Sequence, residues 1–311
     1  MDSVVSARQN SPVVVGVDGS RTHQVIVDLA VAEAVRRCAP LLIVHAWPGR
    51  YAGPLRPRGP VPTEQDGRHL LELTARRAQH LAPQLRVRTE LSKGSAARVL
   101  AEHSGQARLV VVGHRDAALT RSSWGSTAAY LAHHGACPLL VHRGGVSDRG
   151  PVVLAVSAGD PVTATIACAY EEAALSGSRL VAVHVWTHPT GRDRPPVTNV
   201  TAEYAADRQE AERHLAEALA GWRSIYPDVE VERLVLHDLD VAYTLQRASR
   251  RGRLLVAGMG SNGRLAEMLY GSLGLAMVRQ AECPVLLVPD TFRHPSMPKL
   301  PAGAAAADGR G

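Results

Sequence analysis

The chain has 311 residues, of which 45% are apolar and 21% charged, and its formal net charge is +6. This length suits about two compact domains. With one Phe and four Trp, the cores must consist of Val, Leu and Ala, as in parallel strands buried under helices. No apolar run approaches the roughly 20 residues of a membrane span. The first residues lack the pattern of a signal peptide, so we expect a soluble cytoplasmic protein.

The charge distribution and the cysteine pattern indicate which classes of ligand the chain is suited to bind. The chain through Arg149 has net charge +8 and the remainder −2, but the arginines are scattered, with no aromatic platform or helix-turn-helix pattern beside them. This favours a solvated or phosphate-seeking surface over a nucleic-acid footprint. Arg50, Arg56 and Arg58 share one loop that could contact a bound polyanion. The cysteines form no CxxC pair and lie in apolar segments, so we expect four buried thiols: Cys38, Cys137, Cys168 and Cys283.

The chain repeats itself, which predicts its domain organisation. SPVVVGVDGS at 11–20 corresponds to GPVVLAVSAG at 150–159, and LLIVHAW at 41–47 to LVAVHVW at 180–186, both 139 residues apart. WGSTAAYLAHHGACPLLVHR, beginning at Trp124, corresponds to YGSLGLAMVRQAECPVLLVP, beginning at Tyr270, 146 residues on. We therefore predict an N-terminal extension (1–11), a first domain (12–143), a linker (144–150), a second domain (151–289) and a disordered C-terminal tail (290–311).

Apolar runs alternate with helix-like stretches along each copy. In copy one, strands are predicted at 12–17, 41–46, 85–91, 108–112 and 138–142. In the first intervening helix one face is predicted to carry Val25, Ile26, Leu29 and Ala32. Thr63 is the predicted N-cap of the next helix, whose apolar face carries Leu70, Leu71, Ala75 and Ala78. The alternation predicts α/β architecture: two tandem Rossmann-like, doubly wound domains, each with a five-stranded parallel-type sheet and helices on both faces.

A glycine-rich stretch in copy two resembles a dinucleotide fingerprint but stands in the wrong context. Gly258-x-Gly260-x-x-Gly263 follows the fourth strand of its copy rather than the first, Cys283 stands twenty positions after Gly263, and little of the chain remains to build the rest of such a domain. The alternative spacing, Gly258-x2-Ser261-x9-Gly271-Ser272, ends at a predicted helix start, where backbone amides suit a phosphate.

The predicted topology places a crevice at the carboxyl ends of the strands in each copy. If the first and fourth strands adjoin, Asp18 and Gly113 face one crevice, and Ser157 and Gly258 face another. With its strand endings V-D-G-S and V-H, its glycine loop and its C-P-V-L-L-V strand, the chain resembles a tandem universal stress protein from residue 12 to residue 289. The resemblance implies an ATP-binding regulatory protein of the stress response, with or without Mg²⁺.

The resemblance also implies roles for individual residues. Asp18 would hold the ribose or adenine end of the nucleotide, and the backbone near Val17 and Ala46 would frame the base. The remaining implied contacts are Gly113, Gly125, Ser126 and Thr127 in copy one, and Val185, Gly258, Gly260, Ser261, Gly271, Ser272 and Leu273 in copy two. The last strands, PLLVH and PVLLV, would pair into an intrachain pseudo-dimer and can extend to a homodimer.

The chain also departs from the family pattern. Asp116 replaces the second loop glycine of copy one, and the span to Gly125 is one residue short. In copy two, Ser157 replaces the aspartate, and Leu239 stands where copy one has Gly94. Copy two is thus expected to retain the phosphate cradle and copy one the base-end contact.

Other interpretations of these residues stay open. Asp18 could be a turn and N-cap residue, and His45 and His184, without partners at ligand spacing, are more consistent with structural histidines. A degenerate module acting by protein contacts, or an enzyme on the same fold, would also fit the architecture. With no G-x4-G-K-[ST] loop and no evident base for water, we expect slow conformational signalling rather than catalysis.

Overall fold

A computed structural model of the chain describes residues 11–20, 22–47, 63–113, 126–143, 145, 149–156, 163–186, 200–238, 240–259 and 280–295. Copy one contains β1 (Val13–Gly16), α2 (His23–Arg36), β2 (Leu41–Trp47), α3 (Glu64–Leu81), β3 (Val87–Lys93), α4 (Ala96–Ser104), β4 (Leu109–Gly113), α5 (Ser126–His134) and β5 (Leu139–His142). Copy two contains β6 (Val152–Val156), α6 (Thr163–Ser176), β7 (Leu180–Trp186), α7 (Val200–Ala218), α8 (Trp222–Ile225), β8 (Val231–His237), α9 (Val241–Ser249), β9 (Leu254–Gly258) and β10 (Val285–Val288). The predicted strand–helix alternation is confirmed.

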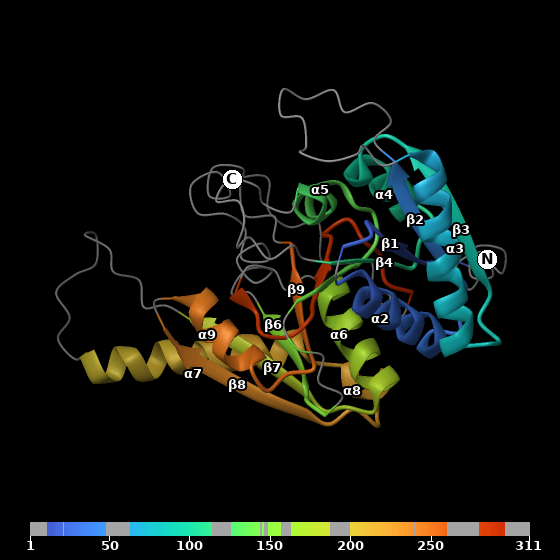
Figure 1. Cartoon of the computed structure of the whole chain (residues 1–311). Helices are drawn as coiled ribbons and strands as arrows, with labels where there is room; N and C mark the ends of the chain where they lie inside the picture. The colour runs from blue at the N-terminus through green and yellow to red at the C-terminus, as the bar shows by residue number, and fades with distance from the viewer. Residues whose placement is uncertain are drawn as a thin grey trace, which may run out of the picture.

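The strands of both copies form one ten-stranded sheet that runs through the molecule (Figure 1), in the order β3-β2-β1-β4-β5-β10-β9-β6-β7-β8. Within each copy the strands are parallel, as β6 to β9 show in copy two. The copies join where β5 and β10 pair antiparallel, with Leu140 opposite Leu286. The predicted pairing of the last strands is confirmed. Each of these two strands also pairs on its other edge, with β4 and β9 respectively, and the extension to a homodimer stays a prediction.

Alternating strand residues build two apolar layers, one on each face of the sheet. Val13 and Val15 pack in the layer covered by α2, α3, α6, α7 and α8. Val14 packs in the layer covered by α4, α5 and α9. The two layers hold the strand ends rigidly, which is what a binding site at those ends requires.

The sequence predicted the N-cap of α3 correctly, and it predicted the buried face of α2 only in part. Thr63 caps α3 as predicted: its hydroxyl accepts a hydrogen bond from the Asp66 amide at 3.2 Å, and the Asp66 carboxylate accepts from the Thr63 amide. In α2, the predicted apolar face is partly wrong, since Val25 is 45% exposed. The helix is apolar on most sides, and the buried face consists of Ile26, Val27, Ala30, Val31 and Ala34.

Two further expectations need correction. Cys38 is exposed after the end of α2, where its backbone has φ +49°, whereas the other three cysteines are buried as predicted. The first six residues of the predicted disordered tail are packed, since His294 is buried and Phe292 contacts the core. Residues 296–311 lie outside the described part of the chain. Within that part, none of the helices combines the length and apolar character that a bilayer crossing requires.

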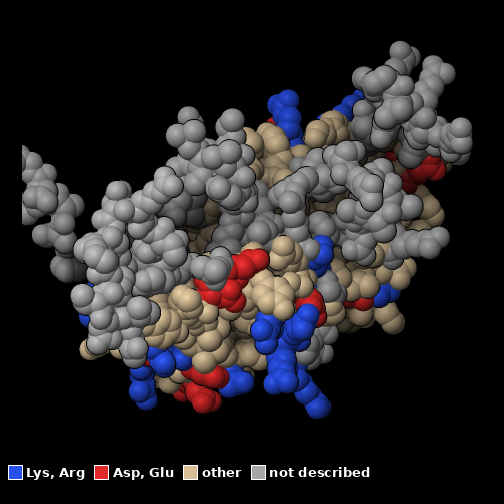
Figure 2. Space-filling view, turned by 90° about the vertical axis from the view of Figure 1, so that its left-hand side faces the viewer, with Lys and Arg blue, Asp and Glu red and all other residues tan. Residues whose placement is uncertain are grey.

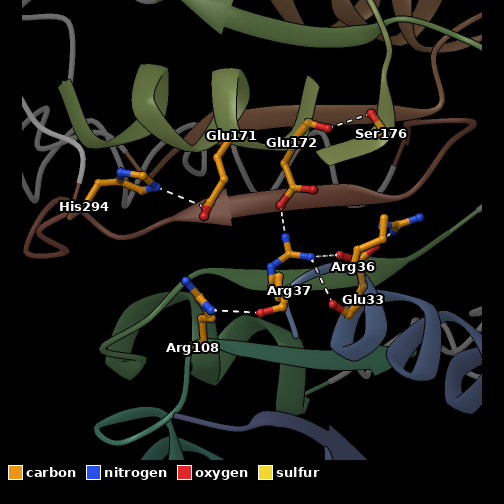
Figure 3. A network of polar contacts seen from close by, with 8 residues as sticks. All are labelled: Glu33, Arg36, Arg37, Arg108, Glu171, Glu172, Ser176 and His294. Atoms are coloured by element: carbon orange, nitrogen blue, oxygen red, sulfur yellow. Dashed lines mark hydrogen bonds and ion pairs between the residues drawn. The ribbon is translucent and has the colours of Figure 1, made fainter. Parts of the chain in front are cut away.

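The copies also meet through a buried polar network between α2 and α6 (Figure 3). The Arg37 guanidinium, just after α2, forms ion pairs with Glu33 of α2 and Glu172 of α6. Arg108 Nη1 donates a hydrogen bond to the Arg37 carbonyl at 3.1 Å, and Ser176 Oγ donates to the Glu172 carbonyl at 2.6 Å. Burial raises the pKa of Glu172, and the charge of Arg37 opposes that rise.

The outer surface seen in Figure 2 carries charges of both signs, with acidic and basic side chains lying close together. Helix α7 illustrates the spacing that brings them together. Arg208 pairs with Glu212, and Arg213 pairs with Glu217, each four residues apart and each at 3.0 Å. Such exposed pairs contribute little to stability. The described residues of this face therefore carry mixed charge.

Candidate functional site

The topology creates a crevice at the carboxyl ends of β1 and β4. From β1 the chain crosses to β2 on one side, while β4 lies against β1 on the other, with Val15 opposite Val111. Copy two repeats this arrangement, because β6 lies between β7 and β9. The prediction that the first and fourth strands adjoin is thus confirmed in both copies. In doubly wound sheets, ligands bind at such switch points.

A tight turn follows β1 at this crevice. Val17 is buried and its amide donates to the Val44 carbonyl at 2.9 Å. Asp18 is exposed, and one carboxylate oxygen accepts a hydrogen bond from the Ser20 amide at 2.9 Å. Gly19 has φ +69°, a conformation that glycine adopts without strain. The turn therefore gives Asp18 a structural role and also places its carboxylate at the mouth of the crevice.

The two histidines at the ends of β2 and β7 have structural partners. His45 Nδ1–H donates to the Val17 carbonyl at 2.7 Å, and His184 Nδ1–H donates to the Val156 carbonyl at 3.0 Å. A Cβ on Gly67 of α3 would lie 3.0 Å from the His45 ring, so glycine allows α3 to approach it closely. These contacts support the interpretation as structural histidines. In each copy the imidazole ties together the two strand ends that frame the crevice.

The next part of the crevice in copy one is formed by the ends of β2 and β3. Ala46 and Trp47 are half-buried, and the Lys93 ammonium lies 5.7 Å from the centroid of the Trp47 ring. The Gly94 amide donates to the Trp47 carbonyl at 3.0 Å, in a turn with φ +125° that favours glycine. Among the described residues, leaving aside its chain neighbours, none has an atom within 4 Å of the point where a Gly94 side chain would begin. This side of the crevice carries a cation, Lys93.

Copy two differs at the same place. Val185 and Trp186 are buried, and the Trp186 ring contacts both Tyr204, at 5.0 Å between centroids, and His237, at 4.5 Å. The Asp238 amide donates to the Trp186 carbonyl at 3.3 Å, which is the bond that Gly94 makes in copy one. Two residues separate His237 from the N-cap Asp240, whereas Gly94 alone separates Lys93 from the N-cap Ser95. Leu239 lies outside the described residues, so its match to Gly94 stays a prediction.

A second aspartate, Asp240, is hydrogen-bonded to Asp238 at this edge of copy two. Its carboxylate accepts hydrogen bonds from the Asp240 amide at 3.1 Å and from the Thr244 hydroxyl. Asp240 in turn caps α9 by accepting from the Tyr243 amide at 2.9 Å. The rim of the copy-two crevice is thus acidic and aromatic, whereas the equivalent rim in copy one carries Lys93.

The described part of the phosphate side consists of Gly113, Gly258 and the start of α5. Gly113 ends β4 beside α2, where a Cβ would lie 2.2 Å from Ile26 Cδ1. Ser126 begins α5, and Thr127 follows it, half-buried. The rest of this side lies outside the described residues: Gly125, Gly260, Ser261, Gly271, Ser272 and Leu273, together with Asp116, Ser157 and the arginines Arg50, Arg56 and Arg58. Their predicted roles stay predictions.

The structure also places one histidine at this crevice that the sequence patterns did not single out. His142 ends β5 and lies opposite Gly113 in the parallel ladder. Burial lowers the pKa of His142, which favours its neutral form. His142 and Gly113 come together only through the register of β4 with β5. The sequence repeat gives one signal, because the position of His142 is occupied by Val288 in copy two.

Comparisons with known proteins were made for the whole chain. The model of the universal stress protein family matches residues 10–143 and 149–289. The chain is 33% identical to a universal stress protein of Mycolicibacterium smegmatis over 291 residues, covering 89% of this chain and 96% of that protein. It is 31% identical to one of Mycobacterium tuberculosis over 297 residues, covering 90% and 97%. A universal stress protein structure from Archaeoglobus fulgidus superposes with a TM-score of 0.62 at 12% identity, covering 91% of this chain and 98% of that one.

Proposed function

The chain belongs to the universal stress protein family as two tandem copies of its domain, and on this basis we propose that it binds an adenine nucleotide. ATP, alone or with Mg²⁺, is the ligand that the loop signature favours. The bound nucleotide would act through conformation and association in a stress response rather than as the substrate of efficient catalysis.

One observation supports this proposal above the others, namely the arrangement of strand ends in copy one. The pairing of β1 with both β2 and β4 brings Asp18, Ala46 and Gly113 to one crevice. Val17 and His45 hold the first two strand ends together through the 2.7 Å hydrogen bond. An exposed carboxylate there can accept hydrogen bonds from ribose hydroxyls, and a half-buried alanine provides an apolar contact for a base. These groups support the proposal that copy one provides the base-end half of a nucleotide site.

The copies differ in ways that make unequal binding the expected behaviour. In copy one, Lys93 carries a positive charge beside the crevice, whereas Asp238 and Asp240 carry negative charges at the same edge of copy two. The negative charges of copy two repel a polyanion such as ATP, although salt screens this repulsion beyond about 10 Å. Copy two in turn retains the full loop length from Gly258 to Gly271. We propose that the base-end contact belongs to copy one and the phosphate cradle to copy two.

A titration calorimetry experiment tests the proposal. The full chain is titrated with ATP, with and without Mg²⁺, and compared with Asp18→Ala and Ser272→Ala. Asp228→Ala serves as the control, because this exposed aspartate lies in the turn before β8, at the opposite end of that strand from the crevice. Loss of one hydrogen-bonded contact should weaken binding on the order of tenfold, with no change in the control.

The outcomes separate the candidate functions. Binding that depends on Asp18 or Ser272 supports the nucleotide-binding protein, and the number of sites per chain shows which copies take part. The absence of binding up to millimolar ATP would refute it and would favour a module that acts through protein contacts alone. The acidic rim formed by Asp238 and Asp240 is the observation that favours this second candidate.

A further inference from the structure

A short segment that follows the last strand lies at the junction between the two copies. Residues 290–295, called the clasp from here on, follow β10 and begin with a turn in which the Phe292 amide donates to the Pro289 carbonyl at 3.0 Å. The Phe292 side chain packs against the apolar layers on both faces of the sheet. His294 is buried, with 5% of its surface exposed. An aromatic and a buried imidazole within three residues are anchors rather than features of a free end.

The clasp forms one wall of a cavity of about 210 Å³ between the two copies. Copy one contributes residues 104–109 and 136–138 to this cavity. Copy two contributes Glu171, Glu172 and Cys168 from α6 in addition to the clasp. Cys137, from copy one, and Cys168 are both buried. The clasp therefore covers a space to which both copies contribute, and one thiol of each copy lines it.

A polar anchor holds the clasp to α6 (Figure 3). His294 Nε2 lies 3.0 Å from Glu171 Oε2. Burial alone would raise the pKa of Glu171, but the hydrogen bond and charge of His294, helped by Arg37 and Arg108, hold it below its ordinary value. The ionised carboxylate therefore prefers the clasped state, and the contact lies beside the Arg37–Glu172 ion pair that joins the copies.

The internal repeat provides a comparison within the same molecule. A second cavity, of about 240 Å³, is lined by Leu140, Arg253, Leu254 and Pro284. These residues match, in the repeat, four residues that line the clasped cavity: Leu286, Arg108, Leu109 and Pro138. After β5, however, the chain leads to β6 rather than ending, and the wall of the second cavity includes Val25, which is 45% exposed. The clasp is thus a feature of one side of the junction.

We propose that residues 290–295 act as an intramolecular lid, anchored on α6 of copy two, that closes the cavity between the copies. The lid opens locally, without unfolding of either copy, and its opening exposes Cys137 and Cys168. This device does not depend on nucleotide binding. Anything that displaces the clasp from α6 changes access to the junction.

Thiol alkylation of the full chain tests the proposal. Burial raises the pKa of Cys137 to about 12, and that of its counterpart Cys283 also to about 12, so both thiols react only when the structure opens. Cys137 lies under the clasp, and Cys283 holds the equivalent position in copy two. Rates of modification by iodoacetamide, followed by mass spectrometry for each thiol, therefore report opening at the clasp and provide an internal control.

The variants are Phe292→Ala and His294→Ala, with Val25→Ala on the unclasped side as the matched control. Both clasp variants should accelerate modification of Cys137 and Cys168 on the order of tenfold while the rate for Cys283 stays unchanged. Equal acceleration of all three thiols would show general loosening and would overturn the proposal. Unchanged rates in both variants would do the same, because the clasp would then not be the cover.

Discussion

The buried ion pairs of Arg37 provide the sharpest test of how the two copies are held together. Only 4% of the Arg37 side chain and 8% of the Glu172 side chain are exposed, so solvent screens the interaction little. Replacing Arg37 with Met leaves the Glu172 carboxylate buried without its main partner. Breaking a buried pair in this way costs about 3–5 kcal/mol. We therefore expect Arg37→Met to lower the free energy of unfolding by about that amount at pH 7.

Urea unfolding followed by circular dichroism measures this loss, and Arg179→Met is the matched control. Arg179 pairs with Glu232 at 2.6 Å, but the side chains are 53% and 44% exposed, so its replacement should cost less than about 1 kcal/mol. Adding Glu172→Met to Arg37→Met should recover most of the loss, since replacing both partners with apolar side chains is often neutral. A loss below about 1 kcal/mol for Arg37→Met, or no recovery in the double variant, would refute the reasoning.

The loss should also depend on pH in a defined direction. Burial already raises the pKa of Glu172 above its ordinary value of 4.5, and loss of Arg37 removes the charge that opposes this rise. A carboxyl group with a raised folded pKa destabilises the fold as pH rises from the unfolded value through the folded one. The deficit of Arg37→Met should therefore be largest at neutral pH and shrink as the pH falls towards 4.5. A deficit that grows on acidification would contradict this assignment.

Two further predictions concern single contacts. Thr63→Ala removes the hydroxyl that caps α3 and should lower the free energy of unfolding in urea by about 1 kcal/mol. Ser95→Ala is the control and should cost much less, because the side chain of this N-cap residue of α4 makes no capping hydrogen bond. Equal losses in the two variants would count against the capping argument. Gly113→Ala places a methyl group 2.2 Å from Ile26 Cδ1 and should cost about 1–3 kcal/mol. Ile26→Val in the same chain should recover part of that loss, and a fully stable Gly113→Ala would show that Ile26 moves aside freely.

Much of the fold could be predicted from the sequence because the information is local and repeated. Strand–helix alternation, the apolar run of β1 and the Thr63 cap each depend on residues within one element. The repeat predicted two domains, and the family resemblance predicted the pairing of their last strands. The apolar periodicity of α2 was misleading, because a helix with apolar residues on most sides does not indicate which face is buried, and Val25 is exposed.

The candidate site could be predicted only in part. Asp18 and Gly113 were expected at one crevice because parallel strands end at the same edge of a sheet, and β1 does pair with β4. Ala46 was expected there only from the family resemblance, and β2 pairs with β1 on the other side. The backbone bond from Asp238 to Trp186 depends on the end of β7 and could not be read from spacing. His142 likewise reaches the crevice only through the register of β4 with β5.

By itself, the sequence determined the two copies, their strands and the residues available at each crevice, since these depend on local patterns and on the repeat. Only the tertiary structure decided which equivalent positions of the two copies make different contacts. Arg37 joins Glu33 to its counterpart Glu172, 139 residues away, and Phe292 and His294 turn the start of an apparently disordered tail into a clasp. The physical reason is that burial at the junction depends on contacts between residues far apart in the chain, which composition and periodicity do not record.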